Sequence, residues 1–488
     1  MLFNSQLFIF VFLPVAAAGY FGLNRFRLIG ASTWWLAFAS LAFYTYWNPS
    51  FLPLFLVSIV FNFFAGRYLS RERTRRGRPT AAMRAAVPLI LAANLAPLLW
   101  YKYSNFVFVN ANALFGARLP LSALVLPLGI SFYTFVQIAY IVDSFRGEAP
   151  EYDFANYCVF ITFFPHLIAG PIIHHKQMMP QFFERKNKSL DHENLAAGML
   201  LFSIGLVKKT IVADLFAAWA NMGYGTVVRL SFFEAWLTAL AYTLQLYFDF
   251  SAYSDMALGA ALMFNIRLPV NFDSPYQAVN IQDFWKRWHI TFSRWLRDYI
   301  YIPLGGNRLG EARTYVNLFL TFLIGGIWHG AGWTFVAWGI LHGAATTLQK
   351  AWQRFGTRLP RLAAWFLTFN FVNVAWVFFR AATFRQALGV LAGMVGLNGV
   401  KLPSYLEPRL AALHLRGLEF GAYPSRIPIK TAVPLVALFL GVAFLSPNSN
   451  QITSRFRPNW KYAVLIVALL LVGVLGIRQT STFLYFEF

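Results

Sequence analysis

Long apolar runs recur from one end of the chain to the other, and short polar segments separate them. The runs are 30–48, 51–66, 85–101, 121–142, 195–220, 231–264, 314–349, 431–446 and 462–477. Many approach or exceed the roughly 20 residues that cross the hydrocarbon core of a bilayer. Lipid cannot satisfy free backbone polar groups, so such runs must be helical. The pattern predicts an all-α polytopic membrane protein with about eleven spans, of which residues 2–23 form the first.

Composition and charge agree with a membrane protein and exclude several other classes. Only 12% of the residues are charged, against about 25% in soluble proteins. The cations behind the net charge of +22 lie in short loops, which indicates topology and an anionic ligand rather than nucleic acid. The first 24 residues lack Lys and Arg, so a cleavable signal peptide is not expected. Cys158 is the only cysteine, which excludes a disulfide framework and a thiolate metal site.

The loop cations also predict which side of the membrane each end occupies. Residues 67–84 carry seven arginines and should be cytoplasmic by the positive-inside rule. Counting back through two spans places the N-terminus outside. Basic segments at 350–361 and 455–461 are expected inside, so the last span leads outward to an extracytoplasmic tail, 478–488. We expect residues 1–488 to form a single membrane domain, with short surface helices in the polar loop 398–430.

A basic, aromatic segment covers 281–308, IQDFWKRWHITFSRWLRDYIYIPLGGNR. Its aromatic residues recur at helical spacing, and polar residues follow the same spacing on another face. The aromatic set is Trp288, Phe292, Trp295 and Tyr299, and the polar set is Lys286, His289, Ser293 and Arg297. The pattern predicts one helix that is too polar to span. It is either an interfacial helix with a solvated basic face or a platform for the phosphates of a donor such as coenzyme A.

The stretch 324–333, IGGIWHGAGW, places His329 in an apolar run among four glycines. An ionisable residue at such depth is costly and indicates function. The glycines allow close backbone approach or a broken helix. His329 is therefore either a catalytic base or a hydrogen-bonded structural histidine. His342 follows thirteen residues later, about 220° around a continuous helix, so we expect it on another face in a structural role.

Other polar residues in apolar surroundings are better explained by structure. Asp249 and Asp255 lie in the run QLYFDFSAYSDMALG, and buried carboxylates need polar partners. The stretch 164–182, FPHLIAGPIIHHKQMMPQF, contains His166 and the pair His174–His175. Adjacent residues of a helix point to different faces, and no carboxylate or cysteine stands at ligand spacing, so we expect no metal site.

Five stretches together resemble the membrane-bound O-acyltransferase (MBOAT) superfamily, in particular its bacterial alginate O-acetylation branch. They are FPHLIAGPI, QLYFDFSAYSDMALG, FWKRWHITFSRWLRDYIYIPLGGNR, GGIWHGAGWTF and AWVFFRAATF, which occur in the family's order between about residues 120 and 385. The resemblance implies a helical bundle, with re-entrant or interfacial helices, around a funnel that crosses the membrane. It also implies an acyl donor that enters from the cytoplasm and an acyl acceptor on the far side.

The resemblance further implies roles for individual residues. The family's most constant histidine corresponds to His329 and its second motif histidine to His289, so both are catalytic candidates. The cations of the basic segment become candidate contacts to the phosphates of acetyl-CoA; they are Lys286, Arg287, Arg294, Arg297 and Arg308. Acetyl-CoA is then a donor substrate, and no permanently bound cofactor is expected.

The chain ends on TFLYFEF, which is similar to the C-terminal motif of the small membrane partner in teichoic-acid D-alanylation. That likeness implies that Tyr485 carries the acyl group, while Phe483, Phe486, Glu487 and Phe488 dock the tail. The acetyl group would pass to an extracytoplasmic serine O-acetyltransferase of SGNH type and then to an exopolysaccharide such as alginate. This places the protein in a bacterial inner membrane with both termini in the periplasm. The alternative for the tail is an aromatic belt at the lipid–water interface.

Two other functions fit a polytopic chain with intramembrane His and Asp. A transporter or flippase for a polysaccharide or lipid-linked sugar predicts internal repeats or paired broken helices, which the sequence does not show. A non-catalytic scaffold for an exopolysaccharide complex would leave the glycine-flanked His329 unexplained.

Overall fold

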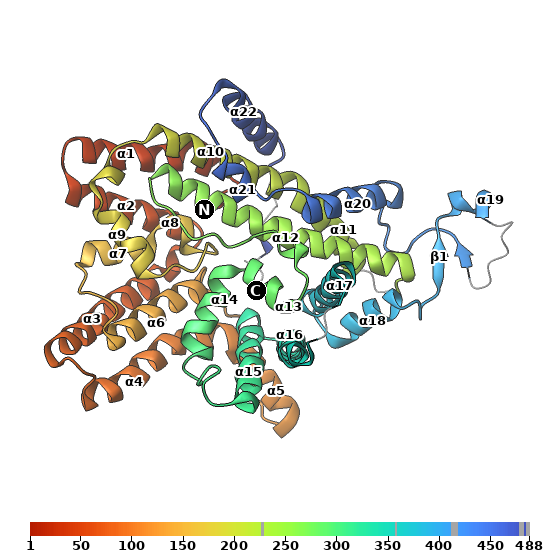
Figure 1. Ribbon diagram of the computed structural model, residues 1–488, viewed down its shortest axis with the longest axis horizontal. Coiled ribbons are helices and arrows are strands. Elements are labelled where there is room, and N and C mark those ends of the chain that lie inside the picture. The colour runs from red at the N-terminus through yellow and green to blue at the C-terminus, as the bar shows by residue number, and fades with distance from the viewer. Residues whose placement is uncertain (226–228, 357–358, 411–417, 478–482, 485–488) are drawn as a thin grey trace. The chain divides into compact units, whose positions relative to one another are not determined.

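The computed structural model describes residues 1–225, 229–356, 359–410, 418–477 and 483–484. These residues are mainly helical, with one small two-stranded sheet, which confirms the predicted all-α class (Figure 1). They divide into two compact units. Unit 1 comprises 1–207, 252–270 and 449–486, and unit 2 comprises 208–251, 271–448 and 487–488. The expectation of a single membrane domain stays a prediction.

Unit 1 is built from the N-terminal helices together with two helices near the C-terminus. In it α3 and α4 both pack on α6, α2 packs on α7, and α10 packs on α21 and α22. The helices are α1 (Leu13–Arg25), α2 (Ile29–Thr45), α3 (Leu52–Arg76), α4 (Ala81–Leu98), α5 (Ser104–Phe115), α6 (Ile130–Arg146), α7 (Phe154–Thr162), α8 (Phe164–Leu167), α9 (His175–Phe183), α10 (His192–Val207), α21 (Ser449–Ser454) and α22 (Trp460–Leu475).

Unit 2 contains the basic segment 281–308 and the candidate histidines His289 and His329. Helix α12 (Phe232–Met263) begins in this unit and ends in unit 1. The other elements are α11 (Asp214–Tyr224), α13 (Ile281–Arg287), α14 (Ile290–Leu296), α15 (Glu311–His329), α16 (Trp333–Trp352), α17 (Arg361–Arg380), α18 (Phe384–Met394), β1 (Val400–Leu402), α19 (Glu407–Leu410), β2 (Leu418–Phe420) and α20 (Ile429–Leu445). Figure 1 shows α15 beside α16 and α16 beside α17, in agreement with their contacts.

Several helices are long and apolar enough to cross a membrane. Among the described residues, five meet both conditions: Phe8–Arg25, Pro49–Arg76, Ala81–Phe115, His192–Tyr224 and Arg361–Arg380. Two shorter apolar helices are α20 and α22. The first of the five overlaps the predicted first span, 2–23. The chain is therefore a multi-pass membrane protein, while the total of about eleven spans stays a prediction.

The long polar loop differs from expectation in one respect. It contains the short helix α19, as predicted, but also strands β1 and β2, which pair in parallel. A buried carboxylate anchors this region. Glu234 accepts hydrogen bonds from the backbone and hydroxyl of Ser231, which caps α12, and its other oxygen accepts two from Ser425. The Ser-x-x-Glu spacing is that of a capping box, and the contact with Ser425 is long-range, so sequence pattern alone does not reveal it.

Candidate functional site

Helices α15 and α16 form a tight hairpin, in which α15 ends at His329. A Cβ atom on Gly326 would lie 2.6 Å from both the Gly339 Cα atom and the Phe335 carbonyl oxygen, so only glycine permits this approach. After His329, Gly330 takes extended backbone angles, and α16 starts at Trp333. The glycine-rich stretch therefore supplies both the close approach and the broken helix that the sequence suggested.

The His329 side chain lies among aromatic rings. Its ring centroid is 4.9–5.3 Å from four other centroids, and the side chain is only 6% exposed. The neighbours are Phe292 of α14, Trp328 of α15, Trp338 of α16 and Phe379 of α17. Such walls fix the orientation of the imidazole and keep bulk water away from it. The arrangement is suited to proton transfer with a substrate group that enters the aromatic enclosure.

His342 and His329 have a ring neighbour in common, although the sequence placed them on different faces of one helix. That expectation assumed a continuous helix, and the chain breaks after His329. The rings of both histidines contact Trp338, at 5.0 and 4.6 Å between centroids. His342 is fully buried, and its Nδ1 accepts a hydrogen bond from the Trp285 indole over 3.2 Å. This bond joins α13 to α16 and fits the structural role expected for His342.

The segment 281–301 is not the single helix that its periodicity predicted. Helix α13 ends at Arg287, and His289 has left-handed backbone angles (φ 43°, ψ 54°) before α14 begins. A non-glycine residue in this region carries backbone strain, and strain of this kind gathers at functional sites. Lys286, Ser293 and Arg297 still line one cavity, but the buried His289 does not, so the expected shared polar face is wrong for His289 alone.

His289 is fully buried and its tautomer follows from its partner. Asn271 Oδ1 accepts hydrogen bonds from the Thr291 backbone N–H and hydroxyl and lies 3.1 Å from His289 Nδ1. Since this oxygen only accepts, Nδ1 carries the proton and Nε2 keeps its lone pair. Burial lowers the pKa of His289 to about 3, so the ring is neutral at physiological pH. The His289 and His329 rings both contact Phe292, at 5.0 and 5.3 Å.

A basic cavity of ≈ 540 Å³ opens beside α14. Three of the predicted phosphate contacts, Lys286, Arg294 and Arg297, line it, and Lys350 of α16 joins them. Ser293, Tyr301 and Asn307 add polar groups, while Trp285, Leu296 and Phe322 add apolar surface. The Arg297 Nε atom also lies 2.7 Å from the carboxylate of the neighbouring Asp298, which raises the pKa of Arg297. Four converging cations beside an apolar wall suit a ligand with phosphates and an organic body.

Arg287 and Arg308, which were predicted to contact the donor phosphates, do not line the cavity. Lys350, which was not predicted, does. Arg287 turns from the cavity to an ion pair with Asp283, at 2.8 Å, and to Asp273. Arg308 is not among the residues that line the cavity, although its neighbour Asn307 is. The sequence indicates only a role in topology for Lys350, which begins the basic segment 350–361. It reaches the cavity because α16 packs against α13, a long-range contact that periodicity in 281–308 does not report.

Of the C-terminal tail, the structure describes residues 483–484, and Phe483 packs within unit 1. The ring of Phe483 is 1% exposed and packs edge-on against Tyr253 of α12, at 4.8 Å between centroids. Tyr253 in turn stacks on Phe3, at 4.9 Å. Phe483 thus contacts Tyr253, while its predicted role in docking the tail stays a prediction. Tyr485, Phe486, Glu487 and Phe488 lie outside the described residues.

The intramembrane carboxylates have the partners that burial requires. Asp249 lies 2.7 Å from the ammonium of Lys209, which lies 2.9 Å from Asp214. Lys209 belongs to a π-helical turn, Lys208–Ala213, between α10 and α11. Asp255 accepts a hydrogen bond of 2.6 Å from Ser449. The expected structural anchoring of Asp249 and Asp255 is thus visible in their contacts.

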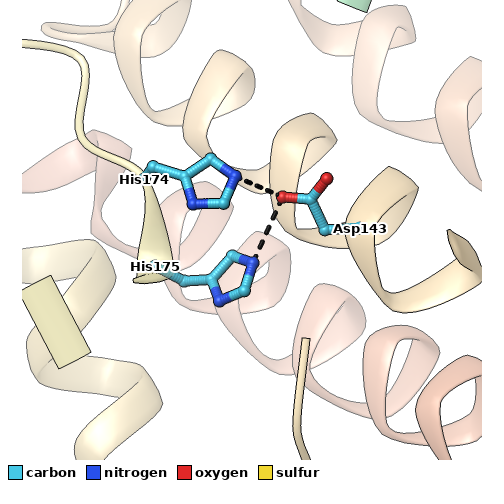
Figure 2. A group of neighbouring side chains, drawn as sticks. All are labelled: Asp143, His174 and His175. Atoms are coloured by element: carbon cyan, nitrogen blue, oxygen red, sulfur yellow. Dashed lines mark hydrogen bonds and ion pairs between the residues drawn. The ribbon is translucent and has the colours of Figure 1, made fainter. Parts of the chain in front are cut away.

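His174 and His175 converge on one carboxylate, contrary to the expectation that they point to different faces of a helix. Helix α9 begins only at His175, and His174 is the extended residue that caps it, so the two side chains need not diverge. Both Nε2 atoms approach the same oxygen of Asp143, at 2.6 Å from His174 and 3.1 Å from His175 (Figure 2). His166 stays separate, with its Nε2 atom 3.0 Å from the Phe160 carbonyl oxygen.

Comparison with known proteins identifies the class to which this fold and these motifs belong. Residues 94–388 match the family model of MBOAT, the membrane-bound O-acyltransferase family. The match covers more than half of the chain, so the chain belongs to this family and is an O-acyltransferase. The resemblance drawn from the five stretches is confirmed.

Individual relatives extend the match to the whole chain. The peptidoglycan O-acetyltransferase of Helicobacter pylori is 43% identical, over 100% of this chain and 98% of that protein. The probable alginate O-acetylase AlgI of Pseudomonas aeruginosa is 39% identical, over 86% of this chain and 79% of that protein. The AlgI protein of Pseudomonas putida is 36% identical over the full length of both chains.

Proposed function

We propose that the protein takes an acetyl group from cytoplasmic acetyl-CoA and passes it across a bacterial inner membrane for O-acetylation of a cell-envelope polysaccharide. One observation carries this proposal. Helix α14 lines the basic cavity with Ser293 and Arg294, and it presents Phe292 to His329. The basic cavity and the candidate base on α15 therefore both adjoin the same short helix, α14, of unit 2.

The basic cavity is the proposed donor site. Coenzyme A carries phosphates at one end and a thioester at the other, joined by an uncharged arm. Lys286, Arg294, Arg297 and Lys350 offer charge-assisted hydrogen bonds to the phosphates. The apolar wall then receives the arm, which leads the thioester toward the aromatic enclosure. A hydrogen bond to a charged group contributes about 1.5–3 kcal/mol, so one cation should change donor affinity by about 10- to 100-fold.

His329 is the proposed general base, and the Tyr485 hydroxyl is the proposed nucleophile. A phenol with a pKa near 10 needs a base at neutral pH. His329 takes the phenol proton, and the oxygen attacks the thioester carbonyl carbon. The C–S bond breaks, and the departing thiolate takes the proton from the imidazolium, so an acetyl-tyrosine and free coenzyme A result. His289 supports the site through the Phe292 ring that both histidines contact.

The acetyl-tyrosine is an aryl ester and is reactive enough for onward transfer. An extracytoplasmic serine O-acetyltransferase of SGNH type takes the acetyl group and esterifies a sugar hydroxyl. The outward-facing tail, the N-terminus in the periplasm and the anchoring of Phe483 belong to this proposal. Peptidoglycan is the first polymer to assay, because the relative with 43% identity over 100% of this chain is named a peptidoglycan O-acetyltransferase. Alginate is the second, after the two AlgI relatives.

The relay is tested by Tyr485→Phe, with Tyr46→Phe as a control because Tyr46 is exposed and far from the tail in sequence. In cells, Tyr485→Phe abolishes polymer acetylation at unchanged protein level, while Tyr46→Phe retains it. Mass spectrometry of the wild-type tail peptide should detect a hydroxylamine-sensitive acetyl group. Full activity of Tyr485→Phe would show instead that an external acceptor takes the acetyl group directly at His329.

The base and the donor site need separate measurements. His329→Ala should lower acetyl-CoA turnover by about 10²- to 10⁴-fold, the usual contribution of a general base. Lys350→Ala should raise KM for acetyl-CoA by about 10-fold or more, while Arg308→Ala, outside the cavity, leaves KM unchanged. A transporter predicts no acetyl-CoA turnover by the purified protein, so absence of turnover would favour that alternative.

A further inference from the structure

We propose that Asp143, His174 and His175 form a binding site for a divalent transition-metal ion, and that Zn²⁺ is the ion they fit best. The three residues offer one ligand atom each, and these atoms all lie within 4.8 Å of one another. Asp143 stands in the last turn of α6, and the histidines stand at the start of α9. Figure 2 shows both imidazoles turned toward the same carboxylate.

The ligand set selects the class of metal. Two imidazoles and one carboxylate match the His₂-carboxylate sets of open zinc sites, which keep a position for water or substrate. Ca²⁺ and Mg²⁺ prefer sets made of oxygen alone, and Cu(I) prefers sulfur. In a tetrahedral site with bonds near 2.0–2.1 Å, neighbouring ligand atoms lie about 3.3 Å apart. The two N–O distances, 2.6 and 3.1 Å, must therefore open by less than an ångström.

Each of the three residues makes a further contact, and those of His175 and Asp143 can orient them as ligands, as in known metal sites. The Tyr152 hydroxyl lies 3.0 Å from His175 Nδ1. The Lys176 backbone N–H donates to His174 Nδ1 over 3.2 Å. The second oxygen of Asp143 faces the Arg146 guanidinium at 3.9 Å. These contacts hold the carboxylate as a monodentate ligand and leave the Nε2 atoms as the inward-facing nitrogens.

Metal binding requires a shift of tautomer in both rings. Without metal, each Nε2–H donates to Asp143. When Nε2 binds the ion, the proton resides on Nδ1 instead, so no proton is gained or lost. The Tyr152 hydroxyl then accepts from His175 rather than donating to it. The Lys176 N–H loses its acceptor at His174, and water replaces it because Lys176 is exposed.

The exposure of the three ligands indicates the side from which the ion enters. The side chains of Asp143 and His175 are 1% exposed, whereas that of His174 is 28% exposed. The ion enters beside His174 and keeps its open coordination position on that side. Once bound, it joins the C-terminal turn of α6 to the N-terminal turn of α9 within unit 1.

The test is equilibrium dialysis of the full chain, purified in detergent with its affinity tag removed and stripped with a chelator. The wild-type protein should retain one Zn²⁺ per chain and give the visible absorption of low-coordinate Co²⁺ when Co²⁺ is supplied. Asp143→Asn, His174→Ala and His175→Ala should each abolish this binding. Tyr152→Phe should weaken it by about 10-fold or more, the usual effect of a contact that orients a ligand.

The control is His192→Ala, which removes an exposed histidine of the same unit and should retain full binding. His174→Ala is the decisive variant, because its partly exposed side chain can be removed with least effect on folding. Equal Zn²⁺ retention by wild type and His174→Ala would overturn the proposal, and so would equal loss in His192→Ala. The readout is metal content, so it does not depend on acetyltransferase activity.

Discussion

The close approach of α15 and α16 gives the sharpest prediction about how the fold positions His329. Gly326→Ala adds one methyl group at the point where the two backbones meet. That methyl carbon would lie 2.6 Å from Gly339 Cα and 2.6 Å from the Phe335 carbonyl oxygen. Both atoms belong to the backbone of α16, so neither can rotate away. The helices themselves must separate.

The size of the effect follows from ordinary contact distances. Carbon atoms pack at about 3.5 Å or more, so α15 and α16 must part by about 0.9 Å. Overpacking of this kind costs about 1–3 kcal/mol, and the better helix propensity of alanine returns about 0.5–1 kcal/mol. The net loss of stability should be about 1 kcal/mol, within a range of about 0–2.5 kcal/mol. His329, the proposed general base, is three residues beyond Gly326, and a displacement near 1 Å at a reacting group costs about 10²-fold in rate.

The assay compares Gly326→Ala with Gly441→Ala in detergent. Gly441 is also inside a helix, α20, but a Cβ there would meet nothing within 4 Å. Gly441→Ala should therefore be as stable as wild type or slightly more stable, with unchanged acetyl-CoA turnover. Gly326→Ala should unfold at lower temperature and lose about 10²-fold in turnover. If the two variants behaved alike in both measurements, the tight hairpin would not be what positions His329.

Two further predictions concern buried charge and a buried thiol. Lys209→Met leaves Asp249 and Asp214 without the ammonium between them, and breaking a buried pair costs about 3–5 kcal/mol; thermal unfolding in detergent measures this, and an unchanged midpoint contradicts it. Burial, and then the nearby Asp153 carboxylate, raises the pKa of Cys158 to about 12. The thiol should therefore resist maleimide at pH 8 until the protein unfolds. Its protonation stabilises the fold below the usual thiol pKa of about 8.5, and that contribution is lost as pH rises toward 12.

The protein class, a polytopic helical membrane protein, and the family could both be predicted from short stretches of sequence. Apolar runs identify membrane helices because every turn of a span lies in the hydrocarbon core. The residues of a span must therefore be apolar over a continuous stretch of sequence. The glycines around His329 predicted a broken or closely packed helix, and α15 ends at that residue. Short motifs in a fixed order were enough to identify the acyltransferase family, which the match over residues 94–388 confirms.

The site could be predicted only in part, because hydrophobic period reports faces of a regular helix and nothing else. His289 has positive φ, a backbone choice fixed by packing and by its bond to Asn271. That break separates His289 from Lys286, Ser293 and Arg297, which line one cavity. A continuous helix drawn through 281–301 cannot anticipate this difference.

The sequence by itself therefore determined that the chain lies in a membrane, that it is mainly helical and which ionisable side chains it offers. These properties depend on residue type and on near neighbours in the chain. Tertiary structure decided which of those residues meet. Lys350 reaches the basic cavity from α16, Phe483 finds Tyr253, and Asp143 comes to the two histidines from another helix. Each of these contacts joins residues far apart in the chain. The free energy of these contacts comes from packing and charge in the folded protein, so the spacing of residues along the chain does not predict them.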